Sequence, residues 1–186
     1  MTVPQLAVLL AATACFLSYG WGLARFFADP GGGKGTGTVK GATALSVVLH
    51  IAAIAFFYDH EVYSFAVALF LYALSLGLFW WAILVNRGRP LTIAFSPDAP
   101  RHLVIAGPYA YIRHPLYLSY TLCWIAGTLA TGQVLLIPTI LGMGWLYHRA
   151  AVAEERKFSV SPLGMEYAHY AERTGRYFPL LFRRPR

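Results

Sequence analysis

The residues best suited to chemistry lie in two polar stretches of an otherwise apolar chain, 101–117 and 148–177. In the first stretch, "RHP" at 113–115 places a proline where a helix can begin, so His114 is expected beside the N-cap. The unpaired N–H groups and the positive dipole end of such a helix favour a carboxylate or a phosphate. The other interpretation, in which Arg113 and His114 only anchor the helix at an interface, stays open.

The second stretch carries two adjacent acids within "AVAEERKF" at 151–158. On a helix, Glu154 and Glu155 point about 100° apart. If one of them faces His114, it can bind a cation or accept hydrogen bonds from hydroxyl or amine groups. Charge balance among the many basic residues is the alternative. After a break at 161–162, "GMEYAHYAER" predicts a further helix that carries Tyr167, Tyr170 and Arg173 on one face.

The elements that must position these residues are predicted to be membrane helices. The chain is 58% hydrophobic and 12% charged, with a mean hydropathy of +0.53, whereas soluble domains carry about 25% charged residues. Uncharged stretches at 3–24, 41–58 and 62–86 each approach the roughly 20 residues that cross a hydrocarbon core. The uncharged stretch 115–147 is too long for one crossing, and Thr131-Gly132-Gln133 divides it into a helical hairpin.

We therefore expect an all-α polytopic membrane protein with about five transmembrane helices and a cytoplasmic C-terminal helical tail. Residues 1–186 form one membrane domain. Within it, 1–86 contain three N-terminal spans, and 87–186 contain a loop, the hairpin 115–150 and the tail.

The basic residues predict the orientation of these spans. All fifteen Lys and Arg residues fall on one side, because the short connections 59–61 and 131–133 contain none. The positive-inside rule assigns that side to the cytoplasm, with the N-terminus outside, as expected for a protein of the bacterial inner membrane. The N-terminal apolar stretch lacks a preceding basic region and is expected to be a span, not a cleaved signal. The net charge of +7 also suits anionic lipids, and nothing indicates a nucleic-acid partner.

A few polar or special residues lie outside the two stretches. The glycine-rich stretch 29–41 predicts a flexible linker, since it lacks the spacing of a phosphate-binding loop. His50 lies within a span; it is a functional candidate there, but a neutral histidine bonded across helices is the favoured interpretation. Cys15 and Cys123 fit no metal or disulfide spacing, and no metal site is predicted.

The motifs as a set resemble the isoprenylcysteine carboxyl methyltransferase family. The resemblance rests on "RHLVIAGPYAYIRHPLY", then "EERKF", then "LGMEYAHYAER…YFP", and extends over 101–179. Phospholipid N-methyltransferases and small-thiol S-methyltransferases share this pattern. It implies a cytoplasmic site for S-adenosylmethionine, roofed by the tail. The positions that match cofactor contacts of the family are Arg101, His102, Leu103, Val104, Tyr109, His114, Pro115, Leu116, Tyr117, Glu154 and Glu155.

The chemical groups of the cofactor suit these residues. A helix N-terminus with Arg113 and His114 suits its carboxylate, a glutamate suits its ammonium or ribose groups, and tyrosine rings suit its adenine and sulfonium. Methyl transfer then depends largely on positioning and desolvation, for which His114, Tyr117 and Arg149 are candidates.

The expected reaction is methylation of a lipophilic carboxylate, thiol or amine at the cytoplasmic face of the membrane. A neutral amine or thiol must lose a proton, and His148 is a possible acceptor. The prenylcysteine enzymes have an arginine four residues before the matched glutamate, where this chain has Ala151, and Arg149 lies two residues out of register. Prenylcysteine itself is therefore not predicted. Candidate substrate contacts are Asn86, Arg149 and Arg173.

Two other functions compete with methyl transfer. Membrane sterol reductases have a similar C-terminal helical arrangement but use NADPH. A non-enzymatic lipid-binding or assembly protein would bind no nucleotide-like ligand at all.

Overall fold

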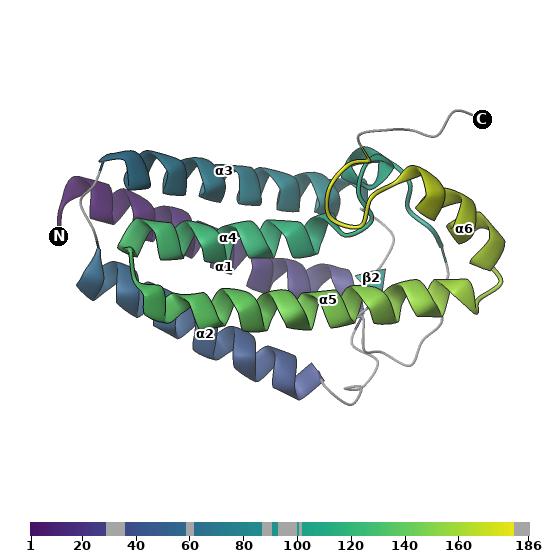
Figure 1. Ribbon diagram of the computed structural model, residues 1–186, viewed down its shortest axis with the longest axis horizontal. Helices are drawn as coiled ribbons and strands as arrows, with labels where there is room; N and C mark the ends of the chain where they lie inside the picture. The colour runs from purple at the N-terminus through teal and green to yellow at the C-terminus, as the bar shows by residue number, and fades with distance from the viewer. Residues whose placement is uncertain (29–35, 59–61, 87–90, 93–99, 101, 181–186) are drawn as a thin grey trace.

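Five long helices lie side by side along the length of the molecule (Figure 1). The structure is a computed structural model that describes residues 1–28, 36–58, 62–86, 91–92, 100 and 102–180. The long helices are α1 (Val3–Phe26), α2 (Thr36–Phe57), α3 (Val62–Val85), α4 (Pro115–Thr131) and α5 (Ile137–Ser159). A shorter helix, α6 (Gly164–Arg173), lies at the end of the bundle opposite the N-terminus.

The remaining regular elements are small. They are two 3₁₀ turns, η1 (Gly107–Ala110) and η2 (Val134–Leu136), and two parallel two-residue strands, β1 (Phe27–Ala28) and β2 (Leu91–Thr92). The expected helical class is confirmed by this architecture.

Among the residues that the structure describes, three helices are long and apolar enough to cross a membrane, and they coincide with the three N-terminal spans that the sequence predicts. Their apolar segments are Val3–Arg25, Gly37–Phe57 and Ser64–Val85. Large hydrophobic side chains on their outer surfaces are exposed, among them Leu17, Phe56 and Phe70, as expected where lipid surrounds a helix. One boundary was wrong: α2 begins at Thr36, so 36–41 are helical although 29–41 was expected to be a linker. No proline follows Pro30 in this stretch, so nothing prevents the helix from starting early.

The hairpin between α4 and α5 turns at the predicted glycine. Gly132 adopts the left-handed conformation with φ of 63°, and its N–H donates to the carbonyl oxygen of Thr128. A residue without a Cβ ends a helix in this way at little cost. Beyond η2, α5 runs for 23 residues to Ser159, which confirms that "AVAEERKF" continues the same helix.

The interior of the bundle joins α1, α2, α3 and α4. His50 is fully buried there, with Nδ1 2.9 Å from the carbonyl oxygen of Ser46 and Nε2 3.3 Å from that of Trp124 on α4. A neutral imidazole carries one N–H, so it donates to one of these two carbonyl oxygens; donation from Nε2 to Trp124 O is the cross-helix bond of the favoured interpretation. Gly127 permits the close approach, since a Cβ there would lie 2.6 Å from His50 Cδ2.

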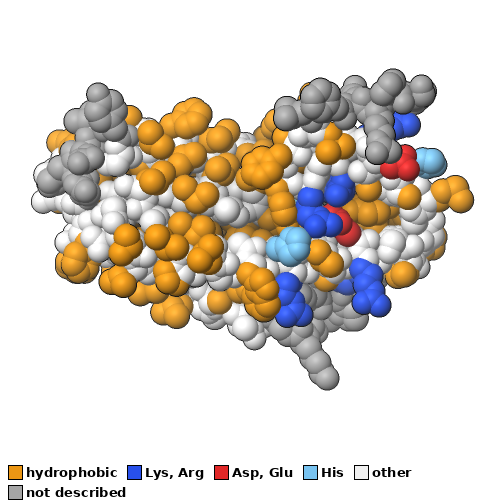
Figure 2. Space-filling model, viewed as in Figure 1, with side chains coloured by type: hydrophobic (Ala, Val, Ile, Leu, Met, Phe, Trp, Pro, Cys, Tyr) orange, Lys and Arg blue, Asp and Glu red, His pale blue; other side chains and the backbone are white. Residues whose placement is uncertain are grey.

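Charged side chains gather at one end of the molecule. On the face shown in Figure 2, the Lys, Arg, Asp, Glu and His side chains of the described residues lie in the half that carries α6. The other half shows hydrophobic and uncharged side chains. The two polar stretches of the sequence therefore meet at one end of the apolar bundle.

Candidate functional site

The site is built where the residues after α6 pair with the residues before α4. We call residues 174–180 the C-terminal segment. Arg113 N donates to Gly175 O at 2.8 Å, His114 N to Arg176 O at 3.1 Å, and Gly175 N to Tyr111 O at 3.2 Å. Position 175 must be glycine, because an added Cβ would lie 1.6 Å from Phe178 O. The pairing holds the C-terminal segment against residues 111–114, just before α4.

The N-terminus of α4 has the predicted form. Pro115 is its first residue and His114 is its N-cap. From α5, both acids reach the His114 ring: Glu154 Oε2 lies 3.4 Å from Nδ1, and Glu155 Oε1 lies 3.1 Å from Nε2. The sequence suggested that one acid faces His114, whereas the structure places the ring between the two. Tyr117 donates its hydroxyl hydrogen to Glu154 Oε1 at 2.7 Å.

Glu155 also binds two arginines. Arg113 Nε donates to Oε1 at 3.0 Å, and Arg176 donates through Nε at 3.0 Å and through Nη2 at 2.7 Å. Arg113 extends further and donates from Nη1 to the carbonyl oxygens of Ala171 and Thr174. We call the resulting group the polar cluster; its members are Arg113, His114, Tyr117, Glu154, Glu155 and Arg176.

The charges in the polar cluster shift its pKa values in the directions expected for ion pairs. Burial opposes the charged form of His114, but hydrogen bonds and charges from Glu154 and Glu155 raise its pKa. Burial likewise disfavours the Glu155 carboxylate, but bonds from His114, Arg176 and Arg113 lower its pKa well below the usual range. A protonated His114 and an ionised Glu155 therefore stabilise each other.

Aromatic rings connect the polar cluster to the bundle. Tyr117 makes two stacked ring contacts, with His114 at 5.6 Å and with Tyr147 at 5.5 Å between centroids. Tyr147 accepts a hydrogen bond at its hydroxyl oxygen from Trp124 Nε1 at 3.1 Å. The hydroxyl group of Tyr117 contacts Glu154, so this ring connects the polar cluster to the aromatic side chains of the bundle.

Several other predicted cofactor residues lie near the polar cluster. Tyr109 packs against the buried group that contains Leu116, and its carbonyl oxygen accepts from Tyr170 at 2.8 Å. Pro115 and Leu116 are buried, which suits packing. Three predicted residues before η1 lie outside regular secondary structure and are partly exposed; they are His102, Leu103 and Val104. Arg101 lies outside the described residues.

The predicted substrate residues are not gathered in the polar cluster. Arg149 is exposed, with its guanidinium 5.0 Å above the Trp145 ring, and Arg173 is exposed at the end of α6. Asn86 is fully buried; its Nδ2 donates to Ala82 O, and its Oδ1 accepts no hydrogen bond from the residues that the structure describes.

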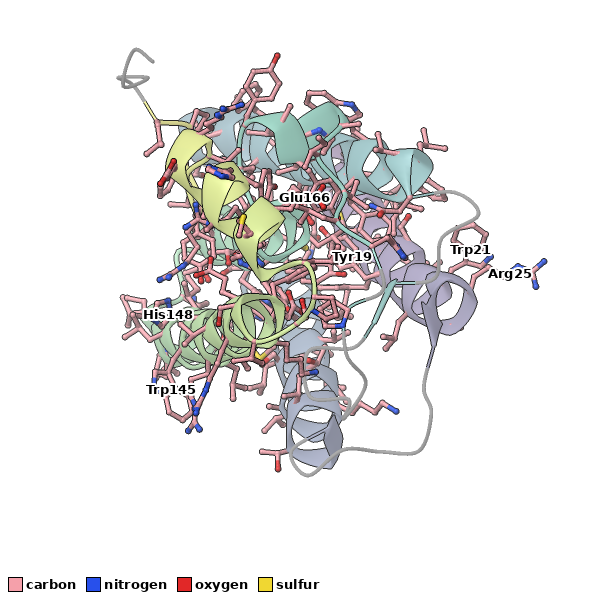
Figure 3. All side chains as sticks on the ribbon, turned by 90° about the vertical axis from the view of Figure 1, so that its right-hand side faces the viewer. Tyr19, Trp21, Arg25, Trp145, His148 and Glu166 are labelled. Atoms are coloured by element: carbon pink, nitrogen blue, oxygen red, sulfur yellow. The ribbon has the colours of Figure 1, made fainter. Side chains whose placement is uncertain are left out.

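His148 lies at the edge of the site. Figure 3, viewed from the charged end, shows Trp145 and His148 projecting from one flank of the molecule and Trp21 and Arg25 from the other. His148 Nδ1 lies 3.3 Å from the hydroxyl oxygen of Tyr177 in the C-terminal segment.

Sequence reasoning missed two residues of this site. Arg176 was not singled out, because only the pairing of the C-terminal segment places it beside Glu155. Tyr147 was taken as the end of an uncharged span, although its spacing of seven residues from Glu154 puts both on one face of α5. That spacing was a usable signal, whereas no spacing in the chain connects Arg176 with Glu155.

Comparison with known proteins agrees with these motifs. The sequence model of the family described as "Phospholipid methyltransferase" matches residues 62–161, just over half of the chain. A curated relative, the cobalt-zinc-cadmium resistance protein CzcN of Cupriavidus metallidurans, is 32% identical over 108 residues. The match covers 58% of this chain and 44% of that relative, so the chain spans less than half of the relative's length. Neither match points to a reductase.

Proposed function

The chain belongs to the phospholipid methyltransferase family of membrane methyltransferases, and on this premise we propose that it transfers a methyl group from S-adenosylmethionine to a lipophilic acceptor. The observation that carries the proposal is the position of His114. It caps α4 at the charged end of the bundle, between two acids of α5. Two distant parts of the chain thus supply one polar cluster beside an apolar bundle.

The polar cluster suits the chemical groups of the methyl donor. Glu154 accepts one hydrogen bond from Tyr117, and its side chain is 26% exposed, so it retains acceptor sites for an ammonium or for ribose hydroxyls. The α4 N-terminus with a protonated His114 suits a carboxylate. The donor, when bound, supplies an electrophilic methyl group on a sulfonium. We propose that His114, Tyr117 and Glu154 contact it, together with Arg101, His102, Leu103, Val104 and Tyr109.

The chain's own task is to align the acceptor and keep water away. A lone pair of the acceptor forms a bond to the methyl carbon while the carbon–sulfur bond breaks and leaves its electron pair on sulfur. A carboxylate or thiolate acceptor reacts without further proton transfer. A neutral amine or thiol releases a proton, and we propose that His148, exposed on α5, takes it up.

The proposed setting is the cytoplasmic face of the bacterial inner membrane. We propose that α4 and α5 complete five spans. With 17 residues, α4 is about 25 Å long, which approaches the thickness of a hydrocarbon core. The acceptor then arrives from the bilayer and the donor from the cytoplasm, and they meet where the charged end adjoins the apolar bundle.

Three residues are proposed to shape the acceptor site: Asn86, Arg149 and Arg173. Within the described part of the chain no hydrogen bond to the buried Oδ1 of Asn86 is recorded, and we propose that this oxygen accepts from a donor group of the acceptor. Ala151 is fully buried and does not supply the arginine contact of the prenylcysteine enzymes, so the proposal is a lipophilic acceptor and not prenylcysteine in particular.

The test is to incubate the purified protein with methyl-labelled S-adenosylmethionine and a membrane extract, and to identify labelled products by mass spectrometry. We expect label in a lipid-soluble product, and its loss in His114→Ala. Glu166→Gln, which changes an exposed acid on α6, is the matched control and should retain activity. Equal labelling by wild type and His114→Ala would contradict the proposed site, and stabilisation by NADPH but not by S-adenosylhomocysteine would contradict the proposed reaction.

A further inference from the structure

The two adjacent acids of α5 differ in how much of their bonding capacity is already used. Glu155 makes four close contacts, three on Oε1 from Arg113, His114 and Arg176 and one on Oε2 from Arg176. A carboxylate offers about four lone-pair sites, so these contacts leave little for a ligand. Glu154 has one hydrogen bond and one longer contact, and is the more exposed of the two side chains, 26% against 16%.

The partners of Glu155 belong to the parts that enclose the site. Arg176 lies in the C-terminal segment, and Arg113 binds carbonyl oxygens of Ala171 and Thr174 at the end of α6. The backbone pairs between 111–114 and 174–176 run beside these bonds. Glu155 therefore connects α5, the start of α4 and the C-terminal segment through one carboxylate.

Loss of the Glu155 charge would have a defined structural consequence. Arg113 is 13% exposed and Arg176 is 35% exposed, so each would lose its charge partner in a partly desolvated place. His114 would keep only the longer contact to Glu154, and its ring would no longer be fixed at both nitrogens. The C-terminal segment would then lose its ion pair to α5 and be held by its backbone pairs, by the Arg113 bond to Thr174 O and by the contact between His148 and Tyr177.

We propose that Glu155 is a positioning residue, which acts on the methyl donor through Arg113, His114 and Arg176, and that Glu154 is the acid that touches the donor. This division of roles rests on the proposed function. It departs from the family resemblance, in which Glu155 matches the acid that holds the cofactor.

The test is a double-mutant cycle in the full-length protein in detergent. The affinity for S-adenosylhomocysteine is measured by calorimetry for Glu155→Gln, Arg176→Gln, Glu154→Gln and the pairwise doubles. Hydrogen exchange is followed in peptides that cover 110–116 and 172–178. Arg176→Gln breaks the same ion pair by changing its more exposed partner. The proposal can therefore still be tested with this variant if Glu155→Gln fails to fold. Glu166→Gln is the matched control.

We expect Glu155→Gln and Arg176→Gln each to weaken binding by at least about tenfold and to speed exchange in both peptides. The double variant Glu155→Gln/Arg176→Gln should have the same affinity as the single variant that binds less tightly, because both substitutions break the same ion pair. Glu154→Gln should weaken binding of S-adenosylhomocysteine without speeding hydrogen exchange in either peptide. In the double variant Glu154→Gln/Arg176→Gln, the two losses of affinity should multiply.

Opposite results would overturn the division of roles. One such result is that Glu155→Gln binds S-adenosylhomocysteine more weakly while the hydrogen-exchange rates of both peptides stay unchanged. Another is that the losses of affinity in Glu155→Gln and Arg176→Gln multiply in the double variant. If the wild-type protein bound no S-adenosylhomocysteine, the proposed function would fail. The exchange rates would still decide whether Glu155 holds the C-terminal segment.

Discussion

The apolar bundle and the charged end of this molecule are held together by different forces. In the bundle, helices approach closely where side chains are small, as at Gly127 beside His50, and apolar packing fills the interior. At the charged end, one carboxylate binds two arginines and a histidine, and a short backbone pairing holds the C-terminal segment. The stability of the apolar packing depends weakly on pH and charge, whereas the stability of the ion pairs at the charged end depends on both. Each region should therefore fail under its own kind of change.

The largest effect is expected at Gly175. In Gly175→Ala the new Cβ would collide with Phe178 O at 1.6 Å, so the pairing of the C-terminal segment with 111–114 must break. We expect binding of S-adenosylhomocysteine to be lost while the helical circular dichroism of the bundle is retained. Unchanged binding would show that the pairing does not hold the site. Gly142→Ala, where a Cβ meets nothing within 4 Å, is the control.

The charged end should also respond to pH in two directions. The pKa of His114 is raised in the fold, so its contribution is complete below the usual histidine value of about 6.5 and is lost as pH rises through the raised pKa. The pKa of Glu155 is lowered, so its contribution is present above the usual value of about 4.3 and is lost as pH falls toward the lowered pKa.

Hydrogen exchange in peptides 110–116 and 172–178, corrected for its intrinsic pH dependence, measures both the loss of protection at high pH (the alkaline limb) and the loss at low pH (the acid limb). Protection should be greatest between these limits. The groups that face His114 are Glu154, Glu155, Tyr117 and Tyr177. His114→Gln should remove the alkaline limb and leave the acid limb. A flat profile in the wild-type protein would contradict the role of the ion pairs.

A change inside the bundle should have the reverse signature. In Gly127→Ala the Cβ would lie 2.6 Å from His50 Cδ2 and 3.0 Å from Tyr72 Oη, and overpacking of this kind costs about 1–3 kcal/mol. We expect a lower unfolding temperature, with affinity for S-adenosylhomocysteine unchanged below that temperature. Gly144→Ala, which meets no atom within 4 Å, should be neutral. A loss of affinity at unchanged stability would show that the two regions are coupled.

The smallest effect is expected at the border between the regions. Arg149 is exposed, and its guanidinium lies over the exposed Trp145 ring. Arg149→Gln should change the affinity for S-adenosylhomocysteine by less than about twofold. If Arg149 contacts the acceptor as proposed, the KM of the acceptor should rise while donor affinity holds. A large loss of donor affinity would place Arg149 inside the donor site.

The same two regions differ in how well the sequence predicts them. Long uncharged stretches predicted α1 and α3 to within a few residues, and Pro115 and Gly132 marked the start of α4 and the turn after it. These signals are local, since hydropathy, a proline and a glycine act on the residues beside them. The start of α2 was placed too late, because residues 36–41 contain two glycines, two threonines and a lysine and are nevertheless helical.

At the charged end, one of two interpretations of the sequence had Glu154 or Glu155 facing His114, and neither interpretation specified which bonds result. Arg176 joins Glu155 only after the C-terminal segment pairs with 111–114, and that pairing spans more than 60 residues of chain. Arg149 and Arg173 appeared suitable by charge, but their helices turn them outward. Periodicity alone does not fix such contacts, since they depend on how α5, α6 and the C-terminal segment pack together.

The most direct test of the account is calorimetric titration of S-adenosylhomocysteine into the wild-type protein and into His114→Ala, both folded in detergent. The account predicts saturable binding to the wild type and no measurable binding to the variant, because His114 joins the start of α4 to both acids of α5. Equal affinity in the two proteins, or no binding to the wild type, would contradict it.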